Sequence, residues 1–137
     1  METPCEKTYC LSEALRDALW EAAIAAAPGE ACGMVTGKGR RFLVFWKARN
    51  ASEDKNSFLM HPEDQLAAID GAEQQGHDLV AVFHSHPRGP ASPSEKDLAL
   101  LAYPGYLYMI ASLEQREMHI YEASEGTLKR TGLVVKG

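Results

Sequence analysis

The sequence has few cysteines, no cluster of basic residues and no long hydrophobic run. Cys5, Cys10 and Cys32 include no Cys-x-x-Cys pair, so a disulfide framework is not indicated and free thiols are expected, with a Cys5–Cys10 bridge as the alternative. The net charge is -5 without any Lys/Arg run, which argues against nucleic-acid binding. The apolar stretch 22–27 is too short to cross a membrane, and no signal peptide is apparent. We therefore expect a cytoplasmic protein without nucleic-acid or membrane partners.

The length and composition predict one globular domain over residues 1–137. Hydrophobic residues make up 45% and charged residues 24% of the chain, which is ordinary for a soluble protein. A chain of 137 residues buries a sizeable core without help from disulfides.

Hydrophobic periodicity predicts a mixed sheet flanked by about three helices, an α/β fold. Leu11, Leu15 and Leu19 recur every four residues and indicate a first helix, which Pro28-Gly29 would end. The continuous apolar run 79–83 is typical of a central strand that is buried on both faces. The predicted elements are helices over 12–27, 62–75 and 93–103, and strands over 31–36, 41–46, 79–83, 106–111, 116–121 and 128–135.

The second and third helices have recognisable start signals. Pro62 suits a first helical turn, and Leu66 and Ile69 are expected to face inward. The segment 92–95 (Ser-Pro-Ser-Glu) forms a capping box, so a third helix is expected to begin there.

The most informative motif is the segment 84–87 (His-Ser-His-Pro), which Ser94 and Asp97 follow. On an extended strand, residues two apart point to the same face, so the two imidazoles are expected side by side. Ser94 and Asp97 are three apart at the start of the predicted third helix and should share a face. Two imidazoles and a carboxylate form a ligand set that leaves one coordination position for water, as catalytic zinc sites do. We therefore expect His84, His86 and Asp97 to bind one Zn²⁺ per chain.

A metal site is favoured although each residue alone has a simpler explanation. A single histidine at a strand end is commonly a surface or core residue, and Asp97 alone could be a solvated charge. Two histidines at this spacing after a buried strand, with an aligned aspartate, rarely arise by accident. Bound zinc would lower the pKa of its water toward ~7 and supply hydroxide at neutral pH. Ser85 should face the opposite side of the strand and is predicted to be structural.

The spacing His-x-His-x(7)-Ser-x-x-Asp, with Pro87 and Pro93, resembles the JAMM (MPN+) family of zinc isopeptidases. Glu30-Ala31-Cys32-Gly33 is similar to that family's glutamate-bearing strand, and 58–62 is similar to the segment before its middle helix. The resemblance runs from about Leu11 to the end and implies the cytidine-deaminase-like fold in its minimal prokaryotic form. Little room remains after the third helix for the insertions with which eukaryotic members grip ubiquitin.

The resemblance also implies roles for the site residues. His84, His86 and Asp97 would bind zinc. Glu30 would take a proton from the metal-bound water and deliver it to the leaving amine. Ser94 would hydrogen-bond the oxyanion of the tetrahedral intermediate.

From the residues alone, the identity of the general base stays open. Glu30 opens a strand after a tight turn, which would fix its position, but a surface glutamate is the simpler explanation. Glu53 and Glu63 compete for the role, and Glu95 is expected to be occupied by capping.

The resemblance implies a zinc-dependent peptidase that cuts after the C-terminal glycine of a ubiquitin-like or sulfur-carrier protein. The glycine tail could enter a narrow groove as an added strand. The leaving group could be a lysine side chain or a free amino acid, and the lack of ubiquitin-gripping insertions favours a small adduct. Two alternatives remain: a non-catalytic MPN-type scaffold, and a metallopeptidase of phage assembly or cell-wall processing. Both a monomer and a homodimer are compatible with the sequence.

Overall fold

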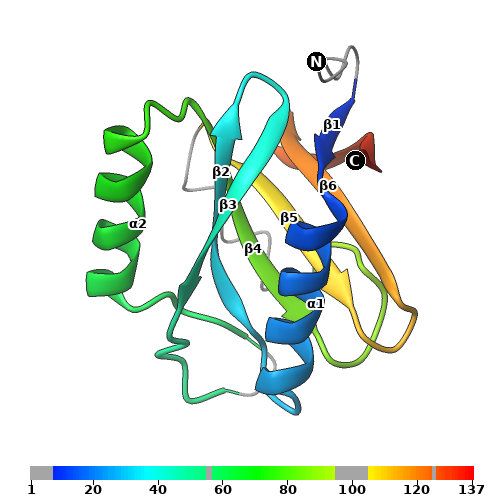
Figure 1. The fold of residues 1–137 in the computed structure, drawn as a ribbon. Helices are drawn as coiled ribbons and strands as arrows, with labels where there is room; N and C mark the ends of the chain where they lie inside the picture. Colours follow the sequence, from blue (N-terminus) through cyan, green and yellow to red (C-terminus); the bar gives the residue numbers. More distant parts are fainter. Residues whose placement is uncertain (1–7, 55–56, 95–104, 125) are drawn as a thin grey trace.

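The computed structural model describes residues 8–54, 57–94, 105–124 and 126–137 (Figure 1). Over these residues it is an α/β fold with one mixed sheet, as predicted, but the sheet has eight strands where the sequence predicted six. The described helices are α1 (Glu13–Ala26) and α2 (Pro62–Gln74). The strands are β1 (Tyr9–Leu11), β2 (Cys32–Lys38), β3 (Arg41–Ala48), β4 (Leu79–His86), β5 (Leu107–Ser112), β6 (Glu117–Ser124), β7 (Thr127–Thr131) and β8 (Leu133–Val135).

Strand β4 lies at the centre of the sheet, whose order is β7-β6-β5-β4-β2-β3-β1-β8. It pairs antiparallel with β2 and parallel with β5. Its residues are almost all buried, so the prediction of a central strand is confirmed. Because β4 is hydrogen-bonded on both sides, the backbone that carries the side chains at its carboxyl end is held rigidly.

Helix α1 covers one face of the sheet. Ser12 caps it, since its side chain accepts a hydrogen bond from the Leu15 backbone N–H at 3.1 Å. Leu15 and Leu19 are buried in the core cluster that also holds Phe83 of β4. The helix ends at Ala26, before the proline that was predicted to end it.

Helix α2 covers the opposite face but presents small side chains to the sheet. Ala68 and Ala72 are its buried residues, whereas Leu66 is 62% exposed. The prediction that Leu66 faces inward is therefore wrong. The Trp46 ring of β3 lies directly against Gly71 of α2, so the contact face has room for small residues only. Ile69 is partly buried, as expected, and packs against the core cluster on this face.

The strand predicted over 128–135 is two strands at opposite edges of the sheet. Strand β7 pairs with β6, whereas β8 pairs in parallel with β1. Only Gly132 separates them, so the sheet curls until its two edges meet. The Gly132 carbonyl accepts a hydrogen bond from Tyr9 N at 2.8 Å, and a Cβ on Gly132 would lie 2.5 Å from Cγ2 of Thr8. This close approach of the chain explains the glycine and the break.

The remaining expectations concern the third helix, the fold family, the cysteines and membrane-spanning segments. The third helix, with Asp97, lies outside the described residues, and the cytidine-deaminase-like assignment stays a prediction. Cys32 is a free, buried thiol, but Cys10 is disulfide-bonded, so the expectation of three free thiols is wrong. Within the described part of the chain, neither helix has the length and apolarity needed to cross a membrane.

Candidate metal centre and cleft

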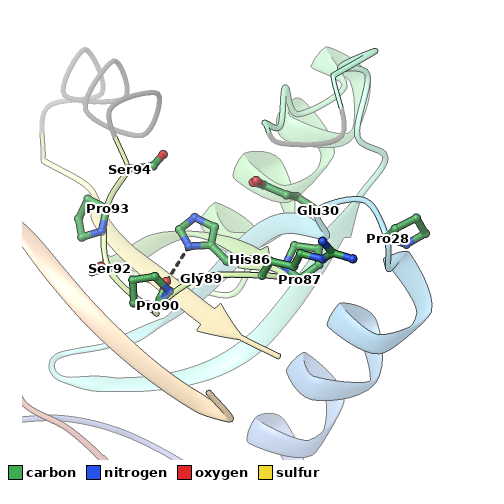
Figure 2. A pocket seen from close by; sticks show the side chains of 10 residues that line it. Pro28, Glu30, His86, Pro87, Gly89, Pro90, Ser92, Pro93 and Ser94 are labelled. Carbon is green, nitrogen blue, oxygen red and sulfur yellow. Dashed lines mark hydrogen bonds between the residues drawn. The ribbon is translucent and has the colours of Figure 1, made fainter. Parts of the chain in front are cut away.

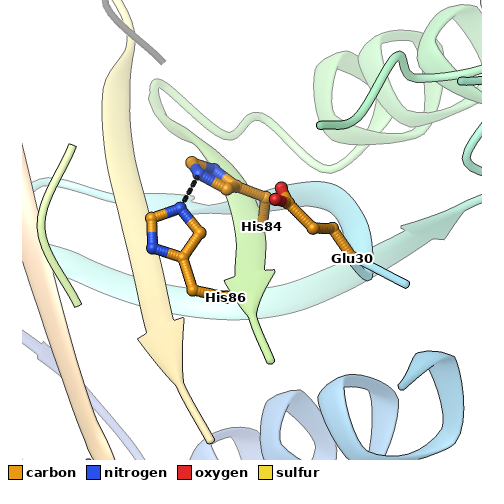
Figure 3. Close-up of side chains that lie close together, drawn as sticks. All are labelled: Glu30, His84 and His86. Atoms are coloured by element: carbon orange, nitrogen blue, oxygen red, sulfur yellow. Dashed lines mark hydrogen bonds between the residues drawn. The ribbon is translucent and has the colours of Figure 1, made fainter. Parts of the chain in front are cut away.

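The carboxyl end of β4 brings two imidazoles together, as the i, i+2 spacing predicted. Both His84 and His86 are buried, and their Nε2 atoms lie 3.2 Å apart (Figure 3). A zinc ion with two nitrogen ligands at about 2.0–2.1 Å and tetrahedral angles separates those nitrogens by roughly 3.3 Å. The imidazole pair therefore already has the spacing that a shared tetrahedral metal requires.

The outer contacts of the two rings fix their orientation. The Nδ1 atom of His86 lies 2.9 Å from the Pro90 carbonyl oxygen. Because a carbonyl oxygen can only accept, Nδ1 carries the proton, and in the neutral ring Nε2 keeps its lone pair. The Phe58 ring stacks on His84, with centroids 4.4 Å apart and planes inclined by 20°.

Glu30 supplies a carboxylate to the same place. It precedes β2 and is 5% exposed, so its explanation as a surface glutamate is wrong. Glu30, His84 and His86 each offer a ligand atom, and these atoms all lie within 4.8 Å of one another (Figure 3). Two imidazole nitrogens and a carboxylate oxygen are the donors that Zn²⁺ prefers, so the described residues fit a metal site.

Ser85 holds the backbone beside Glu30 in place. Its hydroxyl accepts a hydrogen bond from Ala31 N at 2.8 Å, and its own N–H donates to the Ala31 carbonyl at 3.0 Å. Ser85 is fully buried on the face of β4 opposite the imidazoles. The predicted structural role of Ser85 agrees with these contacts.

A cleft of about 580 Å³ opens beside the cluster (Figure 2). Its walls are rich in proline and carry two charged side chains, and they are formed by Pro28, Glu30, His86, Pro87, Arg88, Gly89, Pro90, Ser92, Pro93 and Ser94. In the view of Figure 2, His86 lies between Ser94 and Glu30. Ser94 is exposed and lines the cleft without belonging to the three-residue cluster.

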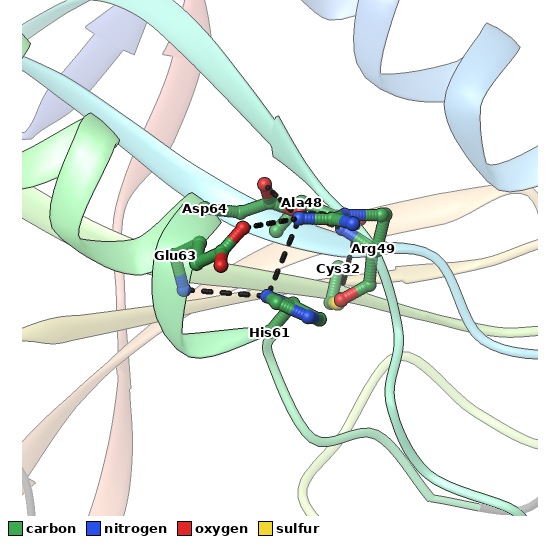
Figure 4. Close-up of polar contacts among 6 residues, drawn as sticks. All are labelled: Cys32, Ala48, Arg49, His61, Glu63 and Asp64. Carbon is green, nitrogen blue, oxygen red and sulfur yellow. Dashed lines mark hydrogen bonds and ion pairs between the residues drawn. The ribbon is translucent and has the colours of Figure 1, made fainter.

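A polar cluster lies at the start of α2 (Figure 4). Arg49 donates to Asp64 from its side chain at 2.9 Å and from its backbone N–H at 2.7 Å. These hydrogen bonds lower the pKa of Asp64 to about 2. His61 caps α2 by accepting from Glu63 N, and Arg49 also contacts both of these side chains.

Cys32 contacts the backbone of Arg49 and stands opposite His84 in the β2–β4 ladder, but it is a packing residue. Burial raises the pKa of its thiol to about 12, and the negative charges of Asp64 and Glu30 act in the same direction. The thiol is therefore protonated at neutral pH, and its sulfur contacts the carbonyl oxygens of Ala48 and Arg49.

Sequence reasoning missed two residues that shape the site, Asn50 and Phe58. The Asn50 side chain donates a hydrogen bond to the carbonyl of Glu30, 20 positions earlier in the sequence. The Phe58 ring stacks on His84, 26 positions later. An asparagine in a polar loop resembles any turn residue. The likeness of 58–62 to a family motif implied no role for its aromatic ring.

Comparisons with known proteins agree with this geometry. Residues 12–124 match the family described as prokaryotic homologs of the JAB domain. The chain is 31% identical over 99 residues to a desampylase of Haloferax volcanii, covering 70% of this chain and 71% of that protein. It is 33% identical over 72 residues to a probable TtuB-protein conjugate cleaving protease of Thermus thermophilus, covering 53% of this chain and 49% of that protein.

Solved structures share the fold. A protein from Desulfitobacterium hafniense has a TM-score of 0.85 and 26% identity to this chain, covering 94% of this chain and 93% of the other. The arrangement of β4, β2 and the surrounding elements therefore recurs in an experimentally determined structure.

Proposed function

Because the chain belongs to the prokaryotic branch of the JAB (JAMM/MPN) domain family, we propose that it is a zinc-dependent isopeptidase. Its substrate would be a ubiquitin-like or sulfur-carrier protein, cut after the C-terminal glycine. The observation that carries the proposal is the convergence of Glu30, His84 and His86 within 4.8 Å at the edge of a cleft. The two relatives, a desampylase and a probable conjugate cleaving protease, support the same class of substrate.

The proposal gives the chain's own residues separate roles. His84 and His86, with Asp97 from outside the described residues, would hold the metal. When bound, zinc supplies Lewis acidity and a water that ionises near neutral pH. Glu30 would accept the proton of the attacking water and later release it to the leaving amine. Ser94, at the cleft wall, would donate a hydrogen bond to the developing oxyanion.

The cleft suits a tail without side chains. Four prolines line it and make its walls stiff, because the proline ring fixes φ. A glycine-rich tail can lie in such a cleft as an extended segment, since glycine has no Cβ to clash. The name of the Thermus thermophilus relative refers to a protein conjugate, which favours a lysine side chain as the leaving group over the small adduct that the sequence suggested.

A non-catalytic scaffold is the competing function. A scaffold does not need imidazole nitrogens at metal-binding distance from each other. The spacing and orientation of His84 and His86 suit a shared ion and therefore favour the enzyme. The two functions differ in metal content. An enzyme should hold one zinc per chain and lose activity to a chelator, and a scaffold should show neither property.

The variant Glu30→Gln tests the proposal with little change in shape. It should retain stoichiometric zinc but cleave a glycine-tailed carrier conjugate at least about 100-fold more slowly, since general-base catalysis contributes ~10²–10⁴. Cleavage is read by intact mass. Glu53→Gln, at an exposed loop position, is the matched control and should cleave like the wild type.

Two results would contradict these assignments. Near-wild-type cleavage by Glu30→Gln would remove Glu30 as the base. Loss of zinc from Glu30→Gln would make Glu30 a ligand, because its carboxylate lies within reach of both imidazoles.

A further inference from the structure

We infer that Asn50 is a positioning residue that ties the proposed base Glu30 to the aromatic ring behind His84. The inference rests on the proposed function, because it concerns how the base and a metal ligand are held. Asn50 follows β3 and precedes the loop that leads to α2. It is not one of the three residues of the cluster.

The Asn50 side chain uses its full hydrogen-bonding capacity. Its Nδ2 donates to the Glu30 carbonyl at 3.0 Å and to the Ser57 carbonyl at 3.2 Å. Its Oδ1 accepts from Ser52 N and from Leu59 N, both at 3.0 Å. An asparagine amide has two N–H donors and two acceptor lone pairs, so every position is occupied. The partners also fix which end is oxygen, since two are carbonyls and two are N–H groups.

These four bonds join the two halves of the site. Ser57 and Leu59 flank Phe58, so Asn50 holds the backbone on both sides of the ring that stacks on His84. The loop closes beside this point, because Ala51 N donates to the Leu59 carbonyl at 2.7 Å. Loss of the Asn50 amide would therefore remove hydrogen bonds that hold the backbone around Phe58 as well as the one that holds the Glu30 backbone.

The Glu30 backbone is held from two sides. The Asn50 side chain donates a hydrogen bond to the Glu30 carbonyl. The Ser85 hydroxyl accepts one from the next backbone N–H, that of Ala31. Because the backbone sets where the Glu30 side chain starts, a shift of this peptide would move the carboxylate relative to the imidazoles. A misplacement of about 1 Å at a reacting group can cost on the order of 10²-fold in rate. Asn50 should therefore affect turnover more than substrate binding.

The test compares Asn50→Ala with Ser52→Ala in the full chain. The Ser52 hydroxyl bonds within the loop, to Ser57 Oγ at 2.9 Å and to Asp54, but not to Glu30. The readouts are kcat and KM on a glycine-tailed carrier conjugate, and the affinity and visible spectrum of Co²⁺ added alone to the metal-free protein. Asn50→Ala should lower kcat about 10- to 100-fold with KM changed less than about twofold, the range found for residues that orient metal ligands. Its Co²⁺ affinity should fall and the spectrum should change, while Ser52→Ala stays like the wild type.

Asn50→Asp keeps half of the network and serves if Asn50→Ala does not fold. It keeps an acceptor for Ser52 N and Leu59 N but can donate to neither the Glu30 carbonyl nor the Ser57 carbonyl. It should lose kcat, and its Co²⁺ spectrum should change less than that of Asn50→Ala. Wild-type kcat in either Asn50 variant, or an equal loss in Ser52→Ala, would overturn the inference. If the wild type cleaves no conjugate, the proposed function fails, while the Co²⁺ comparison of Asn50→Ala with Ser52→Ala still decides whether Asn50 positions the ligands.

Discussion

The substitution Gly71→Ala in α2 should have two opposing effects on the free energy of unfolding, a gain in helix propensity and a loss from overpacking. A Cβ on Gly71 would lie 2.4 Å from Cη2 and 2.5 Å from Cζ3 of Trp46. The indole cannot move away freely, because its Nε1 donates to Thr36 Oγ1 at 2.7 Å. Thr36 Oγ1 in turn contacts His77 Nδ1 at 2.9 Å. Either α2 must lift from the sheet or this chain of hydrogen bonds must break.

The two effects have opposite signs. Alanine is favoured over glycine in a helix interior by ~0.8–1.0 kcal/mol. Overpacking a filled contact costs ~1–3 kcal/mol, and losing the Trp46–Thr36 hydrogen bond costs about 1 kcal/mol. The free energy of unfolding of Gly71→Ala should therefore fall by roughly 1–3 kcal/mol, from the sum of these terms.

Urea unfolding followed by circular dichroism measures this change, and a second background gives a sharp control. In Trp46→Phe, the ring is smaller and has no N–H, so Gly71→Ala should become neutral or stabilising there. Ala67→Gly, at an exposed α2 position, should cost about 1 kcal/mol from propensity alone. A Gly71→Ala protein that is more stable than the wild type would refute the packing argument.

Two further predictions concern the metal centre and the cluster behind it. Phe58→Leu removes the stacked ring and should weaken Co²⁺ or Zn²⁺ binding about two- to tenfold, from ~0.5–1.5 kcal/mol of stacking. Phe45→Leu, in the core on the α1 side, should not alter metal affinity, and equal losses in competition titrations would refute this. Hydrogen bonds from Arg49 lower the pKa of Asp64 to about 2, below the unfolded value of ~3.9. The resulting stability is present above about pH 4 and is lost as pH falls toward 2. Arg49→Met should flatten urea-measured stability over that interval, and an unchanged slope would contradict it.

The predictable part of the site depends on local geometry. Two histidines two residues apart must share a face of a strand, and the apolar run before them placed that strand in the middle of the sheet. No partner element was needed for this step. The place of Glu30 in the site could be predicted only from the family resemblance. The segments that hold it, β4 and the loop after β3, lie far along the chain.

The unpredicted part depends on contacts between distant segments. The inward face of α2 is set by Trp46 on β3, so Leu66 points outward although its periodicity favoured the core. The break at Gly132 results from a close approach to Thr8, more than a hundred residues earlier. The hydrophobic periodicity of a segment depends on that segment alone and does not indicate which distant segment packs against it.

The parallel pairing of β1 with β8, where Tyr9 stands opposite Leu133, has a consequence for biosynthesis. This ladder can form only after the segment from Tyr9 to Val135 has left the ribosome. Glu30 and the two histidines instead lie at β2 and β4, which are adjacent and emerge much earlier. A nascent chain can thus bring Glu30, His84 and His86 together before its outer strands pair.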